Sequence, residues 1–346
     1  MASMDKANNF HLIRLFAALM VLYSHAHTLA ALPEPVFLGF VPLGPVGVYI
    51  FFALSGYLVY QSFERDPHLA RFLIRRALRL FPALAVVVML SVLVLGPLIT
   101  SVPTADYFRD PATRGHFWNL ALYPIYYLPG VFTTNHVANA VNGSLWSLPV
   151  EFLMYLSVPL TLGSRRLARI GFALLFLCFA TLHFTWIWPS TEMSVFWGSD
   201  LRQVPMCGIF FAAGALISAG RLERYLSLNT LVFAGVLLLA GTVTHPRFFM
   251  ALWLALPIIV LGFGLHSSAV GRWVAARGDY SYGIYLYAFP VQQSLLWWKP
   301  QIAFWPYLLA TLLLTSLAAY ASWHLVENPA LRLKPRRQAP LATAAD

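Results

Sequence analysis

The sequence predicts an all-α integral membrane protein that crosses the bilayer about ten times. Of its 346 residues, 59% are hydrophobic and only 10% are charged, and the mean hydropathy is +0.68. A soluble domain carries about 25% charged residues, so this chain could not cover its apolar surface in water. Its apolar residues also gather in stretches of about 20, the length with which a helix crosses a bilayer. These properties exclude a soluble enzyme, a disordered protein and a nucleic-acid-binding protein.

Ten stretches meet this requirement of length and apolar composition. The first contains Arg14, His25 and His27, which interrupt the apolar run that a cleavable signal peptide would need, so we expect it to be retained. The turn around His245 and Pro246 separates the seventh stretch from the eighth. The predicted spans lie near 10–32, 45–63, 78–99, 144–162, 168–188, 202–219, 228–244, 247–266, 281–298 and 304–325.

The basic residues predict that both termini are cytoplasmic. With the N-terminus inside, seventeen Lys and Arg residues fall on cytoplasmic segments and five on the opposite side, and Arg14 lies within the first span. Cytoplasmic loops of membrane proteins carry such an excess. The net charge of +10 therefore serves mainly to orient the chain.

The rest of the chain predicts one transmembrane domain over 1–334, a disordered cytoplasmic tail over 335–346 and no appended soluble domain. The longest loop, about 100–143, is external and rich in aromatic residues. No internal repeat is evident, which gives no support to a transporter built from repeats. Cys178 and Cys207 fall inside apolar stretches, so we expect neither a disulfide framework nor a metal site.

Two ionisable residues share one face of the first span. Arg14 and His25 are eleven residues apart, which returns them to within roughly 20° of one face and separates them by about 16 Å along the axis. Ala18 on the same stripe leaves room for a slender ligand. Because ionisable groups are costly in a bilayer, we interpret the pair as functional. The alternative is that Arg14 reaches the inner head groups and His25 bonds a neighbouring helix.

The fourth span carries Glu151, the only acidic residue well inside a predicted span. Ser144, Ser147, Glu151 and Tyr155 share one face at three- and four-residue spacing. Counted from the outer ends of their spans, Glu151 and His25 lie at similar depth, about 10 Å. A carboxylate bonded to one imidazole nitrogen raises the basicity of the other, which predicts a catalytic pair. The alternative is a structural ion pair.

A basic cluster precedes the third span and contains Arg75, Arg76 and Arg79. Such clusters commonly mark only the cytoplasmic boundary, but arginine is also the preferred group for binding phosphate. Together with Arg14 it could form a phosphate-binding mouth. Coenzyme A has a matching shape, with phosphates at one end and a thioester on a slender arm at the other.

The chain resembles the acyltransferase-3 family of membrane acyltransferases, bacterial members of which O-acetylate surface glycans. The resemblance covers about 10–330 and rests on the order and spacing of several short motifs. These are Arg14 with His25, Phe51-Phe-Ala-Leu-Ser-Gly-Tyr57, Arg76-Ala-Leu-Arg79 before Phe81-Pro82, Leu145-Trp-Ser-Leu-Pro-Val-Glu151 with Tyr155, Ser281-Tyr-Gly-Ile-Tyr285, and Glu327-Asn-Pro329.

The resemblance implies ten spans, an acyl-CoA donor in the cytoplasm and a hydroxyl acceptor at the outer side. The family's arginines and first-helix histidine look like Arg14, Arg76, Arg79 and His25, and its glutamate looks like Glu151. Many members have an aspartate where this chain has His11 and a second histidine where it has Ala288, which excludes a role for that histidine here. Many relatives also carry an extracellular hydrolase-like domain, which we do not expect here.

We therefore expect an O-acyltransferase of the bacterial inner membrane that moves an acyl group, in the first place acetyl, from acyl-CoA to a glycan or glycolipid. His25, oriented by Glu151, would act as general base or accept the acyl group transiently. Acyl length, acceptor and oligomeric state stay open. The alternatives are a transporter or flippase and a non-catalytic scaffold. Cofactor-binding residues would be Arg14, Arg75, Arg76 and Arg79, and substrate-binding residues Trp146, Ser147 and Tyr155; no metal is expected.

Overall fold

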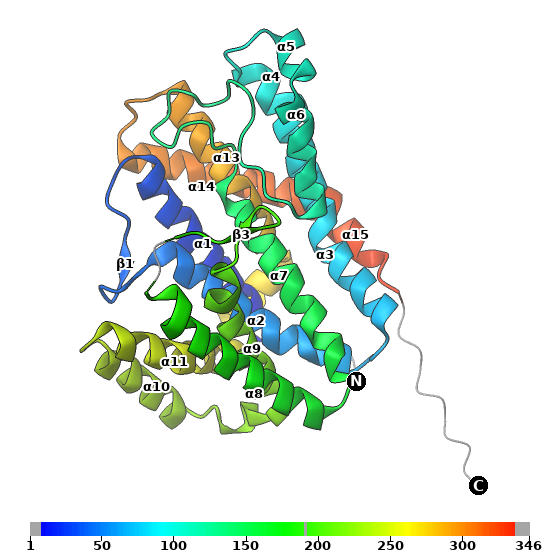
Figure 1. The fold of residues 1–346 in the computed structure, drawn as a ribbon, viewed down its shortest axis with the longest axis vertical. Coiled ribbons are helices and arrows are strands. Elements are labelled where there is room, and N and C mark those ends of the chain that lie inside the picture. The colour runs from blue at the N-terminus through cyan, green and yellow to red at the C-terminus, as the bar shows by residue number, and fades with distance from the viewer. Residues whose placement is uncertain (1–7, 190–191, 336–346) are drawn as a thin grey trace.

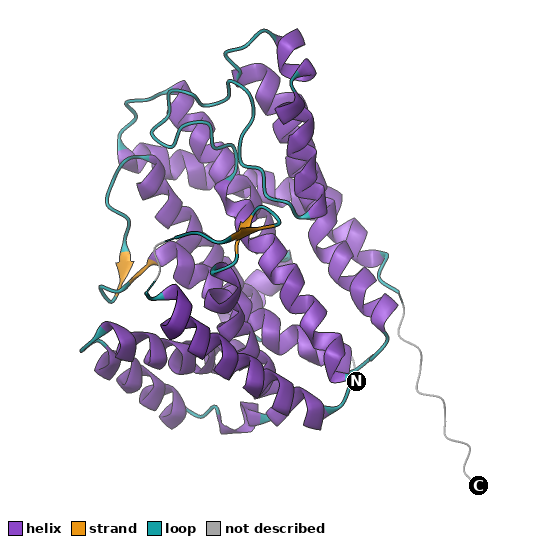
Figure 2. Cartoon of the chain, in the orientation of Figure 1, coloured by secondary structure: helices purple, strands orange, loops and turns teal. Residues whose placement is uncertain are grey.

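The computed structural model describes residues 8–189 and 192–335, which are mostly helical (Figure 1, Figure 2). Residues 336–346 of the predicted tail, and Lys6, Arg336 and Arg337 of the charge count, lie outside the described residues. The elements are α1 (Phe10–Leu29), β1 (Val36–Phe37), β2 (Val41–Pro42), α2 (Leu43–Glu64), α3 (Leu69–Leu90), η2 (Ser91–Leu95), α4 (Gly96–Ile99), α5 (Thr104–Arg109), α6 (Pro111–Gly115), η3 (His116–Ala121), η4 (Gly143–Trp146), α7 (Ser147–Ser157), η5 (Val158–Thr161), α8 (Arg165–Leu182), η6 (His183–Ile187), β3 (Val195–Phe196), β4 (Ser199–Asp200), α9 (Gln203–Gly220), η7 (Leu222–Tyr225), α10 (Leu228–Gly241), α11 (His245–Leu265), α12 (Ala269–Arg277), α13 (Ser281–Trp298), α14 (Phe304–Ser322), η8 (Trp323–Glu327) and α15 (Asn328–Arg332).

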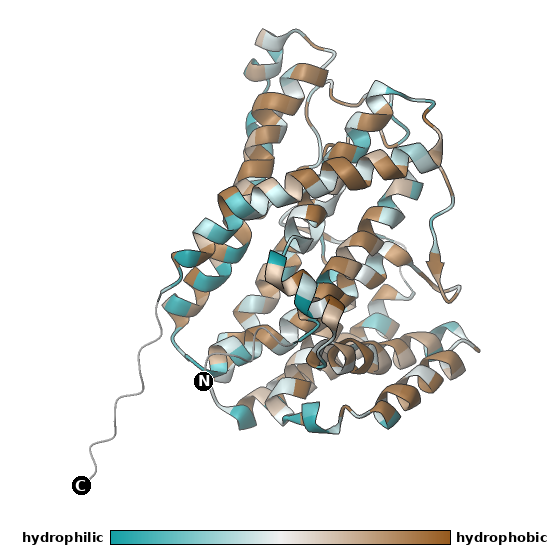
Figure 3. Cartoon of the chain, turned by 180° about the vertical axis from the view of Figure 1, so that it is seen from behind, coloured by the Kyte–Doolittle hydropathy of each residue, from teal (hydrophilic) through white to brown (hydrophobic). Residues whose placement is uncertain are grey.

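The predicted class is confirmed: the chain is an all-α, multi-pass membrane protein. Within the described residues, seven helical stretches are long and apolar enough to cross a membrane, namely Phe10–Leu29, Leu43–Glu64, Leu69–Ile99, Arg165–Ile187, Gln203–Gly220, His245–Leu265 and Phe304–Arg332. The other three predicted spans coincide with α7, α10 and α13, of which α7 has 11 residues and α10 has 14. The number ten stays a prediction. Figure 3 shows apolar residues along the helices and hydrophilic residues gathered towards their ends.

Several helices begin and end where local chemistry dictates. Ser164, Ser227 and Ser268 each accept a backbone N–H in the first turn of α8, α10 and α12, as N-cap serines do.

The π-helical segments η2, η6 and η8 continue α3, α8 and α14 without a break. The last stretch therefore runs beyond its predicted end at 325. As a result Glu327 is a second acidic residue inside a span, which corrects the expectation that Glu151 is alone.

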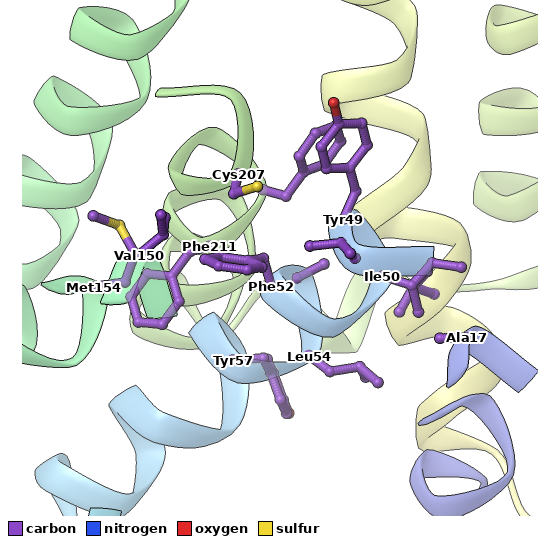
Figure 4. Packing of buried hydrophobic residues seen from close by; sticks show 14 of the residues in the cluster. Ala17, Tyr49, Ile50, Phe52, Leu54, Tyr57, Val150, Met154, Cys207 and Phe211 are labelled. Carbon is purple, nitrogen blue, oxygen red and sulfur yellow. The ribbon is translucent and has the colours of Figure 1, made fainter. Parts of the chain in front are cut away.

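The tightest helix contact joins α2 to α9. A Cβ atom on Gly56 would lie 1.9 Å from the carbonyl oxygen of Phe211, and one on Gly214 would lie 2.1 Å from that of Ala53. The two backbones can approach this closely only because both positions are glycine. Figure 4 shows Phe52 and Tyr57 of α2 beside Phe211 of α9 in the apolar core that results. α2, packed in this way against α9, forms one wall of the site described below.

The external loop does not stay at the surface but descends between the helices. Asn142 is buried; its side-chain amide donates to the Leu286 carbonyl oxygen at 2.9 Å, and its Oδ1 accepts from the Ser144 N–H at 3.1 Å. Irregular backbone is tolerated at membrane depth when protein groups satisfy it in this way. Leu286 is five residues into α13, so Asn142 lies about 8 Å from the cytoplasmic end of that helix along its axis. The helix that carries Glu151 therefore starts deep inside the bundle.

The two ends of the described chain lie on the same side of the bundle. Asn9, just before α1, accepts hydrogen bonds from the backbone N–H and the hydroxyl of Ser268 between α11 and α12. Arg79, halfway along α3, pairs with Asp279 before α13 and with Glu327 near the end of the described chain. Both ends of the described chain thus lie on one side, and that this side is cytoplasmic stays a prediction.

Candidate functional site

A cavity of about 90 Å³, large enough for several water molecules, lies among α1, α2, α3, α7 and α13. Its charged and hydroxyl-bearing lining comes from five separate elements, and the remaining walls are apolar. The polar lining residues are Arg14, Ser55, Arg76, Arg79, Ser147, Glu151, Tyr155, Ser281, Tyr282 and Tyr285. Six residues singled out from the sequence thus share one cavity: Arg14, Arg76, Arg79, Ser147, Glu151 and Tyr155.

Two of the cavity arginines are held by a buried acid that the sequence analysis missed. Asp279 accepts from Arg14 at 3.1 Å and from Arg79 at 2.7 Å, and Arg79 also lies 3.6 Å from Glu327. Burial alone would raise the pKa of Asp279, but the guanidinium groups of Arg79 and Arg14 outweigh it and hold the pKa well below its usual range. The positive charges of the two arginines are therefore paired with the two acidic side chains, Asp279 and Glu327.

Arg76 has different surroundings. Within the described residues it forms no salt bridge or hydrogen bond, and its Nε is enclosed without a partner. Its guanidinium carbon lies 5.8 Å from the centroid of the Tyr155 ring and 5.9 Å from that of Phe72. An enclosed cation without an acidic partner favours an anionic ligand.

Lys334 adds to the positive potential around these arginines. Desolvation, followed by the positive charges of Arg76 and Arg79, lowers the pKa of Lys334 to about 8. The sequence analysis counted this lysine only as an orienting charge. Its position beside the arginines could be found only from the fold.

Arg75 does not reach the cavity, which corrects its predicted place among the cofactor-binding residues. It is buried and donates to Asp66 at 2.7 Å, while Arg71 donates to the other carboxylate oxygen at 2.6 Å. The reason is the geometry of the helix, because consecutive residues such as Arg75 and Arg76 are about 100° apart around the axis of α3. Only the second of the two faces the cavity, and the first ties α3 to the loop before it.

Glu151 is held by two hydroxyl groups inside the cavity. The hydroxyls of Ser55, at 3.3 Å, and of Tyr155 both donate to Oε1 of Glu151. On the turn above, the hydroxyls of Ser147 and Tyr285 lie 2.6 Å apart, and Tyr285 donates to the Ser144 carbonyl oxygen at 2.8 Å. These groups present carboxylate and hydroxyl oxygens that can bind the N–H and C=O groups of a ligand.

The predicted contact between His25 and Glu151 is wrong for this structure. The His25 ring packs against Phe289, with centroids 5.4 Å apart, and Phe289 also packs against Gly143 at the start of η4. Glu151 lies eight residues beyond Gly143, about 12 Å further along the helix axis. Its depth was misjudged because the chain enters this helix deep in the bundle and not at the membrane surface.

His25 and Trp146 do not line the cavity. His25 lies further along α1, towards the C-terminal end of that helix. Arg14, by contrast, lines the cavity together with Glu151, so the cavity lies at the N-terminal end of the Arg14–His25 face of α1. Ser55, Ser281 and Tyr285 do line it and were part of the resemblance motifs, but no role was assigned to them. In the sequence, Asp279 is distinguished only as an acidic residue next to a predicted span.

The fold and the cavity define a helical membrane protein with a cavity lined by three arginines, a glutamate and several hydroxyl groups. The model of the acyltransferase domain family matches residues 8–326, and the chain belongs to this family of membrane acyltransferases. Arg14, Arg76, Arg79, His25 and Glu151 all lie within the matched residues.

The chain is also similar to several characterised proteins. It is 30% identical to the O-acetyl transferase of Shigella phage Sf6, over 94% of this chain and 96% of that protein. It is 32% identical to nodulation protein 10 of Rhizobium leguminosarum bv. viciae, over 94% of each. It is 25% identical to peptidoglycan O-acetyltransferase OatA of Listeria monocytogenes, over 72% of this chain and 45% of that protein. No solved structure matches the chain.

Proposed function

We propose that the protein moves an acetyl group from cytoplasmic acetyl-CoA to a hydroxyl group of a glycan or glycolipid at the outer side of the bacterial inner membrane. The observation that carries this proposal is the cavity that holds Arg14 and Arg76, which has no acidic partner among the described residues, with His25 eleven residues beyond Arg14 on α1. Arg14 and His25 are separated by about 16 Å along α1, a distance that suits a donor with a long, slender arm. Two relatives named as O-acetyltransferases support the group transferred.

The cavity residues would bind the donor. Arg76 would bind a phosphate of coenzyme A, with Lys334 and the balanced pair of Arg14 and Arg79 beside it. Glu151 and Ser147 would bind amide groups of the arm, because a carboxylate accepts N–H bonds and a hydroxyl can also donate to a carbonyl. In this arrangement Glu151 positions the donor and does not orient His25.

His25 would perform the transfer at the upper end of the arm. As general base, it takes the proton of the acceptor hydroxyl while the hydroxyl oxygen attacks the thioester carbon. A C–O bond forms, the C–S bond breaks, and the thiolate that leaves with the electron pair takes up the proton from His25. In the second route Nε2 of His25 attacks the thioester carbon, the C–S bond breaks and the thiolate leaves with the electron pair. The acceptor hydroxyl oxygen then attacks the acetyl carbon, the C–N bond to the imidazole breaks, and the hydroxyl proton passes to the thiolate.

Replacement of the two histidines of α1 tests this function. His25→Ala should lower the transfer of labelled acetyl from acetyl-CoA to membrane glycans by about 100-fold or more, because general bases contribute that much. His27→Ala is the matched control, since the His27 ring packs between Tyr23 and Phe304 on another face of α1. It should keep activity within a few-fold.

Two results would contradict the proposal. One is a stably inserted His25→Ala protein that acetylates at the normal rate. The other is a purified wild-type protein that moves glycolipid between leaflets without consuming acetyl-CoA, which would favour the flippase alternative.

A further inference from the structure

Two adjacent glutamines of α13 are fully buried but differ in their bonding. The side-chain amide nitrogen of Gln293 donates to the carbonyl oxygens of Val137 and Ala140 at 2.8 Å, and its Oε1 accepts from Asn135 at 2.8 Å. Gln293 therefore anchors the external loop with all of its polar atoms. Gln292 instead faces α1, and its Oε1 is enclosed without a hydrogen-bond partner.

The orientation of Gln292 is fixed by α1. Its Nε2 donates to the Leu22 carbonyl oxygen at 2.8 Å, and because a carbonyl oxygen can only accept, the amide cannot be reversed. Leu22 lies three residues before His25, one turn away on the same side of α1. Phe289, three residues before Gln292 on α13, contacts the His25 ring. The glutamine and the histidine thus belong to the same contact between α1 and α13.

His25 has the complementary unpaired atom. Its Nδ1 is enclosed without a hydrogen-bond partner, and so is Oε1 of Gln292. Buried polar atoms are seldom left unpaired in folded proteins, and the exceptions gather at functional sites. A protonated Nδ1 is a donor and an amide oxygen is an acceptor, so the two unpaired atoms are chemically complementary.

We propose that Gln292 is the positioning residue of His25. Its Oε1 accepts the hydrogen of Nδ1, which fixes the tautomer in which the lone pair of Nε2 is free to take the proton of the acceptor hydroxyl. The Nδ1 proton stays in place during the transfer. Gln292 thereby fills the role that the sequence assigned to Glu151. This inference rests on the proposed function of His25.

Three substitutions test the inference. Gln292→Met keeps the size of the side chain but removes the acceptor, and should lower kcat at least about tenfold while KM for acetyl-CoA stays within about twofold, as expected when a catalytic histidine loses its orienting partner. Gln293→Met is the matched control; it should lower thermal stability but leave the kcat of folded protein within about threefold, because Gln293 bonds only the loop.

Gln292→Glu separates positioning from a merely structural role. It keeps an acceptor oxygen but loses the amide that donates to Leu22, so kcat should stay within about threefold of the wild type if the acceptor matters. A structural tie to Leu22 would make this variant as inactive as Gln292→Met, and that result overturns the inference. So does a Gln292→Met protein with unchanged kcat. If Gln292→Met does not insert stably, the Gln292→Glu result decides. Failure of the proposed function is distinguishable, because His25→Ala would then remain active.

Discussion

Arg75 and Arg76 are sequence neighbours with opposite surroundings, and this difference gives a matched test of the anion site. Arg76→Gln should raise KM for acetyl-CoA roughly tenfold or more, because a charge-assisted hydrogen bond contributes about 1.5–3 kcal/mol. Arg75→Gln should leave KM unchanged but lower the free energy of unfolding by roughly 3 kcal/mol, since it breaks a buried ion pair with Asp66. Steady-state kinetics and thermal unfolding in detergent measure both effects. Equal KM values for the two variants would contradict the assignment of Arg76.

At the residue scale, the sequence identified residues that line the cavity, but it did not predict how deep in the bundle they lie. Arg14 and Glu151 were singled out because ionisable residues rarely lie inside a span without a function, and Arg76 because arginine is the preferred group for binding phosphate. The depth of Glu151 could not be found, because it depends on the hydrogen bond from Asn142 to Leu286, which joins residues far apart in sequence. Asp279 was missed for the same reason: its partners lie on α1 and α3.

At the scale of the elements, the contact between α2 and α9 holds the wall of the cavity in place. Gly214→Ala would put a Cβ atom 2.1 Å from the Ala53 carbonyl oxygen, so the helices must separate. We expect a loss of about 1–3 kcal/mol in the free energy of unfolding, as overpacking typically causes. Gly171→Ala on the exposed face of α8 is the control, because its Cβ would meet nothing within 4 Å and alanine is the better helix former. If both variants unfold at the same temperature, this contact does not support the fold.

Helices were predictable because a 20-residue apolar stretch has no other stable form in a bilayer. All ten predicted spans coincide with helical segments, and η4, α7 and η5 together cover the fourth. The residues at which the helices begin and end were less predictable. α3 begins at Leu69 and not near 78, which places Arg76 and Arg79 on the helix itself. The π-helical η8 extends the last helix far enough to include Glu327. Both features depend on packing against neighbouring helices and not on local hydropathy.

At the scale of the whole molecule, the basic residues and the position of the cavity together predict the side of the membrane from which the donor enters. Two of the arginines that we expect to orient the chain, Arg76 and Arg79, line the cavity together with Arg14. Asp279 and Glu327 pair with Arg14 and Arg79, and Arg76 has no acidic partner among the described residues. His25 lies further along α1 and does not line the cavity. The protein would therefore take its donor from one side of the membrane and serve an acceptor on the other.

The most direct test of this account is the sidedness of the donor. Labelled acetyl-CoA is supplied to sealed inside-out and right-side-out vesicles of bacterial inner membrane, and label is measured on glycans and glycolipids. Because acetyl-CoA is too highly charged to cross a bilayer, the account predicts incorporation by inside-out vesicles on their luminal side, and by right-side-out vesicles only after permeabilisation. His25→Ala vesicles should incorporate none. Equal incorporation by intact vesicles of both orientations would contradict a donor site at the cytoplasmic end of the cavity.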